Sequence, residues 1–92
     1  MEGVERVKGK LAKLFDLPQE VLLNLPLLSL VGDLNLLIEN YEGIIKYTPE
    51  LVKIRVYRGQ ITVIGRELMI DKLKAEKIII TGKIDELKLD VS

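Results

Sequence analysis

The sequence contains neither cysteine nor histidine among its 92 residues. Without cysteine, a disulfide framework, a thiolate metal site and thiol chemistry are all excluded. Without histidine, the chain lacks the side chain best suited to proton transfer near neutral pH and the commonest zinc ligand. The formal net charge is zero, so no overall charge draws the chain to nucleic acid or to an anionic membrane.

Aromatic residues are also few, at 4% of the chain, and long apolar runs are missing. The longest apolar run, over residues 21–31, is interrupted by Asn24, Pro26 and Ser29. It falls short of the roughly 20 residues that a membrane-spanning helix needs. The N-terminus is charged and amphipathic, so we expect no signal peptide. Hydrophobic residues make up 48% and charged residues 30%, which is the balance of a folded domain with a core and a solvated surface.

The first quarter of the sequence has the pattern of a helix followed by a rigid connector. Apolar residues recur at helical spacing over residues 2–16, which predicts an amphipathic helix. Pro18 and Pro26 then frame a connector, because each proline restricts the backbone around it. We divide the chain into residues 1–25, the N-terminal helix and proline-framed connector, and residues 26–92, a β domain, within one structural unit. We expect this predicted helix to dock on the domain or on a partner, or else to lie on a membrane surface.

After Pro26 the apolar period changes to two, which is the period of a β-strand. The clearest alternation covers residues 52–56, where valine and isoleucine alternate with basic residues. Short turn signals at Thr48-Pro49 and Arg58-Gly59 favour antiparallel hairpins, since parallel strands need longer connections. Residues 40–43 also have the composition of a turn.

Two further patterns predict bends in these strands. The apolar parity flips after Ile84, which predicts a bulge or turn near Asp85-Glu86. Gly32, Gly65 and Gly82 each follow a short apolar triplet, and such glycines let strands bend as a sheet curls. The same spacing also fits the rungs of a repeat protein. We therefore predict a mainly β fold, an N-terminal amphipathic helix followed by a curled antiparallel β-meander or sandwich, with a short β-solenoid as the alternative.

Little in the sequence indicates catalysis. The carboxylates fall mostly on predicted turns and outward strand faces, and no histidine is present to activate Ser29 or Ser92. No phosphate-binding glycine motif is present. We expect no enzyme activity and no catalytic, cofactor or metal site.

Binding surfaces are better represented. The connector carries a surplus of apolar residues in a segment too short to span a bilayer, which suggests a docking surface for a partner. Its members are Val21, Leu22, Leu23 and Leu25. Leu37, Val31 and Ile79 interrupt the polar parity of their strands, and they predict either a second buried face or an exposed apolar patch used for assembly.

A second group of residues predicts a basic face on a hairpin. Its members are Lys53, Arg55, Tyr57 and Arg58, with Lys46 beside them. A basic face with an aromatic residue is how small β-barrels hold single-stranded nucleic acid. A solvated strand face has the same pattern, and the low aromatic content makes nucleic acid the less favoured partner.

The order of several motifs resembles one known family. LPQEVLLNLP, LSLVGD, IENYEG, RGQITVIG and KIIITGKIDEL follow one another over residues 17–91, as they do in the YabP/YqfC family of sporulation proteins, with the YqfC branch the more similar. The resemblance implies a role in endospore formation in the cytoplasm of the mother cell, including the periphery of the outer forespore membrane. It implies no enzymatic activity and no cofactor. It suggests a sporulation membrane protein of the YqfD type as a partner.

Three functions are consistent with these patterns. The first is an assembly or adaptor module of sporulation that binds a membrane protein, with peripheral membrane contact or homo-oligomerisation as further features. The second is a small β-barrel that binds nucleic acid. The third is a structural subunit that assembles through its sheet edges, for which residues 78–80 are the candidate edge segment.

Overall fold

The computed structural model describes residues 23–91, which form six strands in one antiparallel sheet of order β1-β2-β6-β5-β4-β3. The strands are β1 (Leu27–Val31), β2 (Asn35–Glu39), β3 (Tyr41–Tyr47), β4 (Leu51–Val56), β5 (Gly59–Leu73) and β6 (Lys77–Val91). The mainly β, antiparallel prediction is confirmed. The β-solenoid alternative is wrong for these residues, because every strand pair is antiparallel. The predicted helix over residues 2–16 lies outside the described residues.

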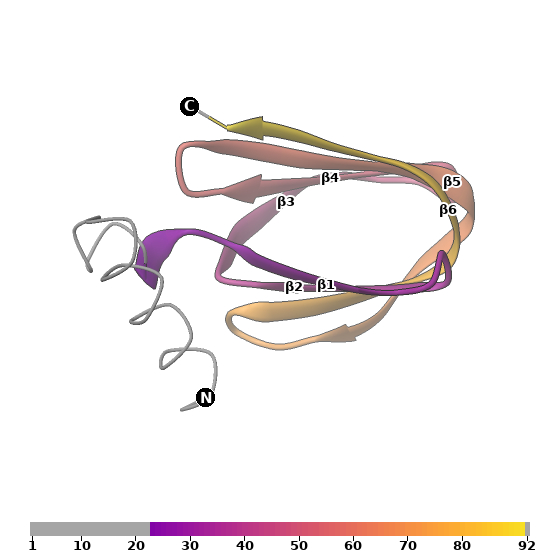
Figure 1. Cartoon of the computed structure of the whole chain (residues 1–92), viewed down its shortest axis with the longest axis horizontal. Coiled ribbons are helices and arrows are strands. Elements are labelled where there is room, and N and C mark those ends of the chain that lie inside the picture. Colours follow the sequence, from indigo (N-terminus) through magenta and orange to yellow (C-terminus); the bar gives the residue numbers. More distant parts are fainter. Residues whose placement is uncertain (1–22, 92) are drawn as a thin grey trace.

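The sheet folds back on itself because β5 and β6 are long and bend in the middle. The first half of β5 pairs with β4, whereas the first half of β6 pairs with β2. The sheet therefore has two layers, which Figure 1 shows as upper and lower halves joined at the bend of β5 and β6. The β3 layer contains β3, β4, the first half of β5 and the second half of β6. The β1 layer contains β1, β2, the first half of β6 and the second half of β5.

Two glycines make the bend sterically feasible. A Cβ atom on Gly65 would collide with the backbone carbonyl of Lys83, and one on Gly82 would lie 2.5 Å from the carbonyl oxygen of Glu67. Gly82 also has a φ of 122° and Glu67 a φ of 51°, values that favour glycine. Gly32 differs, because it lies in the turn between β1 and β2. The curling role predicted for the glycines is thus confirmed for Gly65 and Gly82.

The parity flip in β6 is a β-bulge. Ile64 pairs with Glu86 and the next residue, Gly65, pairs with Ile84, so Asp85 has no residue opposite it. One extra residue in a strand moves all later side chains to the other face. The bulge predicted near Asp85-Glu86 is confirmed.

The hydrophobic core lies between the two layers. It consists of Leu36, Ile38, Ile78 and Ile80 from the β1 layer, Val52, Ile54, Val56, Ile61 and Val63 from the β3 layer, and Leu68 and Ile84 near the bend. Full burial of each large aliphatic side chain contributes about 1.5–3 kcal/mol. Residues 78–80 lie in the interior of the sheet between β2 and β5. The prediction that they form an exposed edge is therefore wrong.

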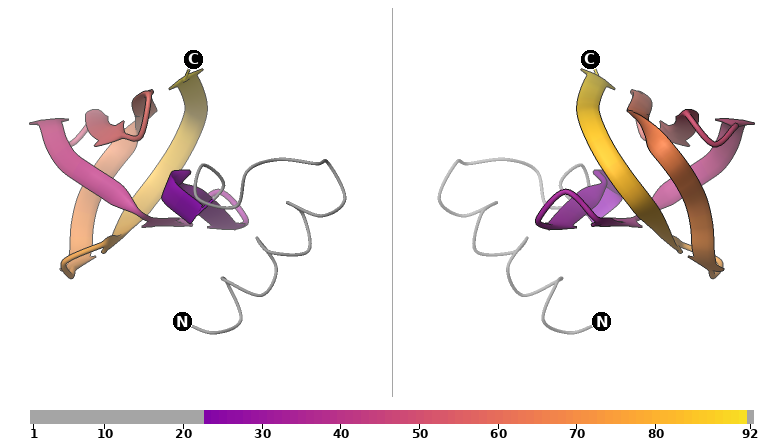
Figure 2. Two further views of the ribbon diagram at one scale, coloured as in Figure 1. Left: turned by 90° about the vertical axis from the view of Figure 1, so that its left-hand side faces the viewer. Right: turned by 90° about the vertical axis from the view of Figure 1, so that its right-hand side faces the viewer.

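A single residue, Asn40, connects β2 to β3, although these strands are not neighbours in the sheet. Its φ of 66° lies in the left-handed region, which asparagine tolerates better than most residues. Its backbone N–H donates to the Glu76 carbonyl at 2.7 Å. The connection between β2 and β3 is shorter than the turn predicted over residues 40–43, since β3 begins at Tyr41. End-on views show how the strands twist from one layer to the other (Figure 2).

Candidate functional site

The folded sheet has two outer faces, one on each layer, that point away from the core. Because side chains alternate along a strand, the residues between buried positions form these faces. On the β3 layer, one row in register across four strands consists of Lys46, Lys53, Thr62 and Lys88. The adjacent row consists of Gly43, Arg55, Gln60 and Asp90. This outer face is therefore mainly polar and charged.

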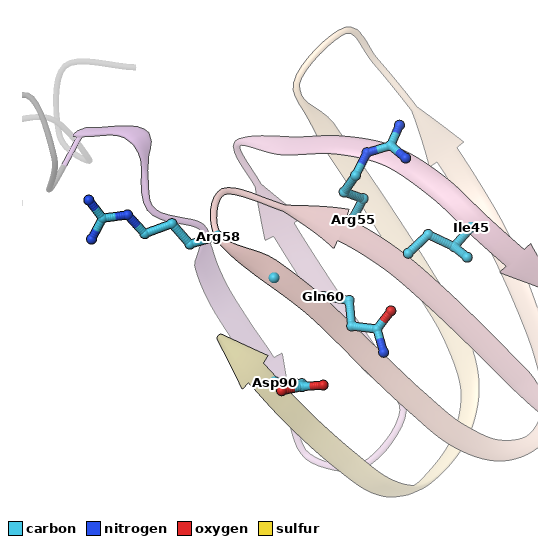
Figure 3. Close-up of a pocket in the computed structure, with 6 residues that line it drawn as sticks. Ile45, Arg55, Arg58, Gln60 and Asp90 are labelled. Atoms are coloured by element: carbon cyan, nitrogen blue, oxygen red, sulfur yellow. The ribbon is translucent and has the colours of Figure 1, made fainter. Parts of the chain in front are cut away.

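An open pocket of about 510 Å³ lies at the second row. Its lining residues are Ile45, Arg55, Arg58, Gly59, Gln60 and Asp90. Figure 3 shows Arg55, Gln60 and Asp90 on successive strands, with Arg58 directed away from them at the turn between β4 and β5. Gly43 leaves room for Arg55, because a Cβ on Gly43 would lie 2.7 Å from Nη2 of Arg55. The pocket contains both a guanidinium and a carboxylate, so it does not select for charge of one sign.

The predicted basic residues lie close together but form only a strip. Lys53 and Arg55 project from the outer face of β4 beside Lys46 of β3. The Arg58 guanidinium lies 5.0 Å from the centre of the Tyr57 ring, within the range of a cation–π contact. The strip ends at the acidic residues of β6, where Glu86 Oε2 lies 3.2 Å from Lys88 Nζ.

The outer face of the β1 layer carries apolar residues at the positions that interrupt the polar alternation of the strands. Leu37 of β2 pairs with Ile79 of β6, and both lie half-buried on this face. The row beside them consists of Val31, Asn35, Thr81 and Met69, so its exposed apolar residues lie at its two ends with two polar residues between them. We call Leu37, Ile79, Val31 and Met69 the outer apolar patch. The sequence left open whether Leu37, Val31 and Ile79 formed a second buried face or a surface patch, and the structure places all three on the outer face.

Lysines border one side of the outer apolar patch. A pocket of about 200 Å³ is lined by Leu37, Ile79, Lys72, Lys74 and Lys77. Lys77 Nζ lies 3.9 Å from Glu39 Oε1, and Glu39 is only 5% exposed. Lys77 thus places an opposite charge near the buried carboxylate at the end of β2, as expected for a buried charge. An apolar floor with a cationic border suits a partner surface that places acidic residues beside apolar ones.

The connector is fastened to the sheet through Asn40. Its side-chain amide donates to the carbonyl oxygens of Leu23 at 2.8 Å and Leu25 at 3.2 Å. Both leucines are half-buried, so part of the predicted apolar docking surface is accessible. The other two predicted residues, Val21 and Leu22, lie outside the described residues. Sequence reasoning missed the role of Asn40; the available signal was an asparagine directly between two apolar strands.

Residues 25–92 match the model of the YabP family. The chain belongs to the YabP family. A relative from Bacillus subtilis (strain 168), "Uncharacterized protein YqfC", is 29% identical over 83 residues, which cover 90% of this chain and 89% of that protein. No solved structure matches the chain. The YabP family match spans all six strands, and the resemblance in the sequence is confirmed.

Among residues 23–91, this YabP family chain has no helix with the length and apolar character needed to cross a membrane.

Proposed function

We propose that this YabP family protein is a non-enzymatic adaptor of sporulation in the mother cell. In this proposal, the outer apolar patch and the connector bind a sporulation membrane protein of the YqfD type at the outer forespore membrane. The sporulation context rests on the family. The adaptor role rests on one observation, which is that four apolar residues lie on an outer sheet face that strand alternation would otherwise make polar.

The geometry of the patch supports a protein partner. Leu37 and Ile79 are half-buried neighbours at its centre, and Val31 and Met69 lie at the two ends of the next row, with Asn35 and Thr81 between them. Exposed apolar side chains on a sheet face gain free energy when a second apolar surface removes them from water. The connector adds Leu23 and Leu25 at the end of the same layer, where Asn40 holds their backbone.

Co-purification of the tagged full chain with a YqfD-type protein from detergent-solubilised membranes tests this function. The variant Leu37→Lys places a charge at the centre of the outer apolar patch, and Met69→Lys places one at its exposed rim. We expect the captured membrane protein to fall by about tenfold or more for Leu37→Lys, because an unpaired charge in an apolar interface is strongly unfavourable. Met69→Lys is expected to lower capture less.

The matched control is Gln60→Lys, which adds the same charge to the outer face of the β3 layer. It is expected to leave capture unchanged, and equal thermal unfolding midpoints would establish that all variants remain folded. Unchanged capture by both patch variants would overturn the adaptor role of this face. Recovery of nucleic acid without the membrane protein would overturn the proposed function itself.

A further inference from the structure

Within residues 23–91, the folded sheet leaves four backbone edges without a strand partner. They belong to β1, β3, the second half of β5 and the second half of β6. An unpaired edge presents backbone N–H and C=O groups to any other strand, and soluble proteins usually protect it with charges, bulges or covering groups. The four edges of this protein differ sharply in that protection.

Two of the edges protect each other. The Tyr47 hydroxyl of β3 accepts a hydrogen bond from the Ile70 N–H of β5 at 3.1 Å, and the Tyr41 hydroxyl donates to the Lys74 carbonyl at 3.0 Å. Both strands also carry register shifts, at residues 41–46 in β3 and 66–72 in β5. These contacts and irregularities make a further regular strand pairing unfavourable.

The free edge of β6 is protected by charge. Its second half contains Asp85, Glu86, Lys88 and Asp90, and the bulge at Asp85 interrupts the regular strand. Charged side chains on an edge strand oppose pairing with a like edge.

The edge of β1 has none of these devices in the part of the chain that the structure describes. Its sequence, LLSLV, contains no charge, proline or glycine. It pairs with β2 in unbroken register over all five residues, which is a usual strand length. Leu30 is 51% exposed and Val31 is 68% exposed. A regular, uncharged and apolar free edge is the kind that recruits another strand.

We propose that β1 pairs antiparallel with β1 of a second copy of this chain, across a two-fold axis at Ser29. In this register Ser29 faces its counterpart, Leu28 faces Leu30 of the second copy, and Leu27 faces Val31. Every cross-strand pair other than the central serines is then apolar, and no like charges meet. A two-fold interface must be self-complementary, and an uncharged strand with its small polar residue at the centre meets that condition.

The chain itself limits the length of this pairing. Pro26 comes directly before β1 and has no N–H to donate. The turn over residues 32–34 follows directly after β1. The two copies therefore pair over residues 27–31 and not over a longer, sliding register. The dimer joins the two β1 layers into one continuous sheet, and it brings the two outer apolar patches onto one face.

The absence of cysteine from the chain makes a cross-linking test direct. In the variant Ser29→Cys, the two new thiols face each other across the axis. Directly opposed antiparallel residues have Cα atoms about 4.5–5.5 Å apart, within the range that a disulfide requires. Mild oxidation of the full-length variant should give a dimer on a non-reducing gel that disappears on reduction.

Two matched variants test the register of the β1–β1 pairing and the choice of β1 as the paired edge. In Val31→Cys the thiols are offset by four residues and roughly 13 Å along the strands, so oxidation should give about tenfold less dimer than in Ser29→Cys. Ile45→Cys places an exposed thiol on the edge strand β3, and it should behave like Val31→Cys. Equal cross-linking of all three variants would mean random collision and would overturn the proposal.

Light scattering on the unmodified chain provides an independent measurement. We expect twice the mass of one chain, falling to the mass of one chain in Ser29→Lys and unchanged in Ile45→Lys. Ser29 is exposed, so the substitution should leave the thermal unfolding of the monomer intact. A single-chain mass for the unmodified protein at its highest soluble concentration would overturn the dimer. It would leave the adaptor function untouched, because Leu37→Lys and Met69→Lys test a different surface.

Discussion

The two layers of the folded sheet have similar inner faces and different outer faces. Inward, both present mainly aliphatic side chains, and nine of these are completely or almost completely buried. Outward, the β3 layer presents the row Lys46, Lys53, Thr62 and Lys88, whereas the β1 layer presents Leu37 and Ile79. The same alternating strand pattern thus produces a solvated face in one layer and an apolar face in the other.

This difference indicates where the molecule meets a partner. An inner face must be apolar for the chain to fold, so its composition says little about function. An outer face is under no such requirement, and an apolar outer face costs solubility without contributing to the core. The net charge of zero does not reveal this contrast, because it sums over all side chains irrespective of the face on which they lie.

The bend that joins the layers is the feature whose loss should have the largest effect. Gly65→Ala places a methyl group against the backbone carbonyl of Lys83, which cannot move without breaking the sheet. We expect the free energy of unfolding to fall by about 3 kcal/mol or more, measured by urea denaturation.

Gly43→Ala is the control for this substitution. Its new methyl group meets only the flexible end of Arg55, so the effect should stay within about 0.5 kcal/mol. A similar loss for both variants would contradict the steric account of the bend.

Asn40 is the second point at which the layers and the connector are held together. Asn40→Gly keeps the positive φ but removes the two hydrogen bonds to Leu23 and Leu25, which should cost about 1–2 kcal/mol. Asn40→Ala should cost about 1 kcal/mol more, because alanine also resists the left-handed conformation. Equal denaturation midpoints for the two variants would show that the backbone conformation contributes nothing.

The free energy of unfolding should respond more strongly to a change of polarity on the outer face of the β1 layer than on that of the β3 layer. Ile79→Thr removes apolar surface from a half-buried position on the β1 layer, and it should lower the free energy of unfolding by about 1 kcal/mol. Thr62→Val makes the reverse change on the β3 layer, and it should alter stability by less than about 0.5 kcal/mol. Denaturant midpoints of both variants measure the contrast. A larger loss for Thr62→Val than for Ile79→Thr would reverse the assignment of the two faces.

The sequence predicted the local features of the fold well. The alternation over residues 52–56, the turns at Thr48-Pro49 and Arg58-Gly59 and the bulge at Asp85 all depend on neighbours within a few residues. Periodicity and turn chemistry report such local geometry directly.

Pairing between distant strands was harder to predict from the sequence. The first half of β6 lies between β2 and β5, and this placed residues 78–80 in the interior and not at an edge. The reason is that a strand's own pattern records which face is buried but not which strands lie on either side of it. The outer apolar patch was visible only as a set of parity exceptions, since Leu37 and Ile79 become neighbours only through the pairing of β2 with β6.

The sequence by itself thus determined the mainly β class, the strand period, the turns, the bulge and the absence of thiol and imidazole chemistry. These follow from side-chain types and their spacing along the chain. The tertiary structure alone decided which of the three glycines lie at the bend, that Asn40 carries the chain from one layer to the other, and that β1 is a terminal strand of the sheet. Each of these depends on contacts between residues far apart in the chain, which local spacing does not encode.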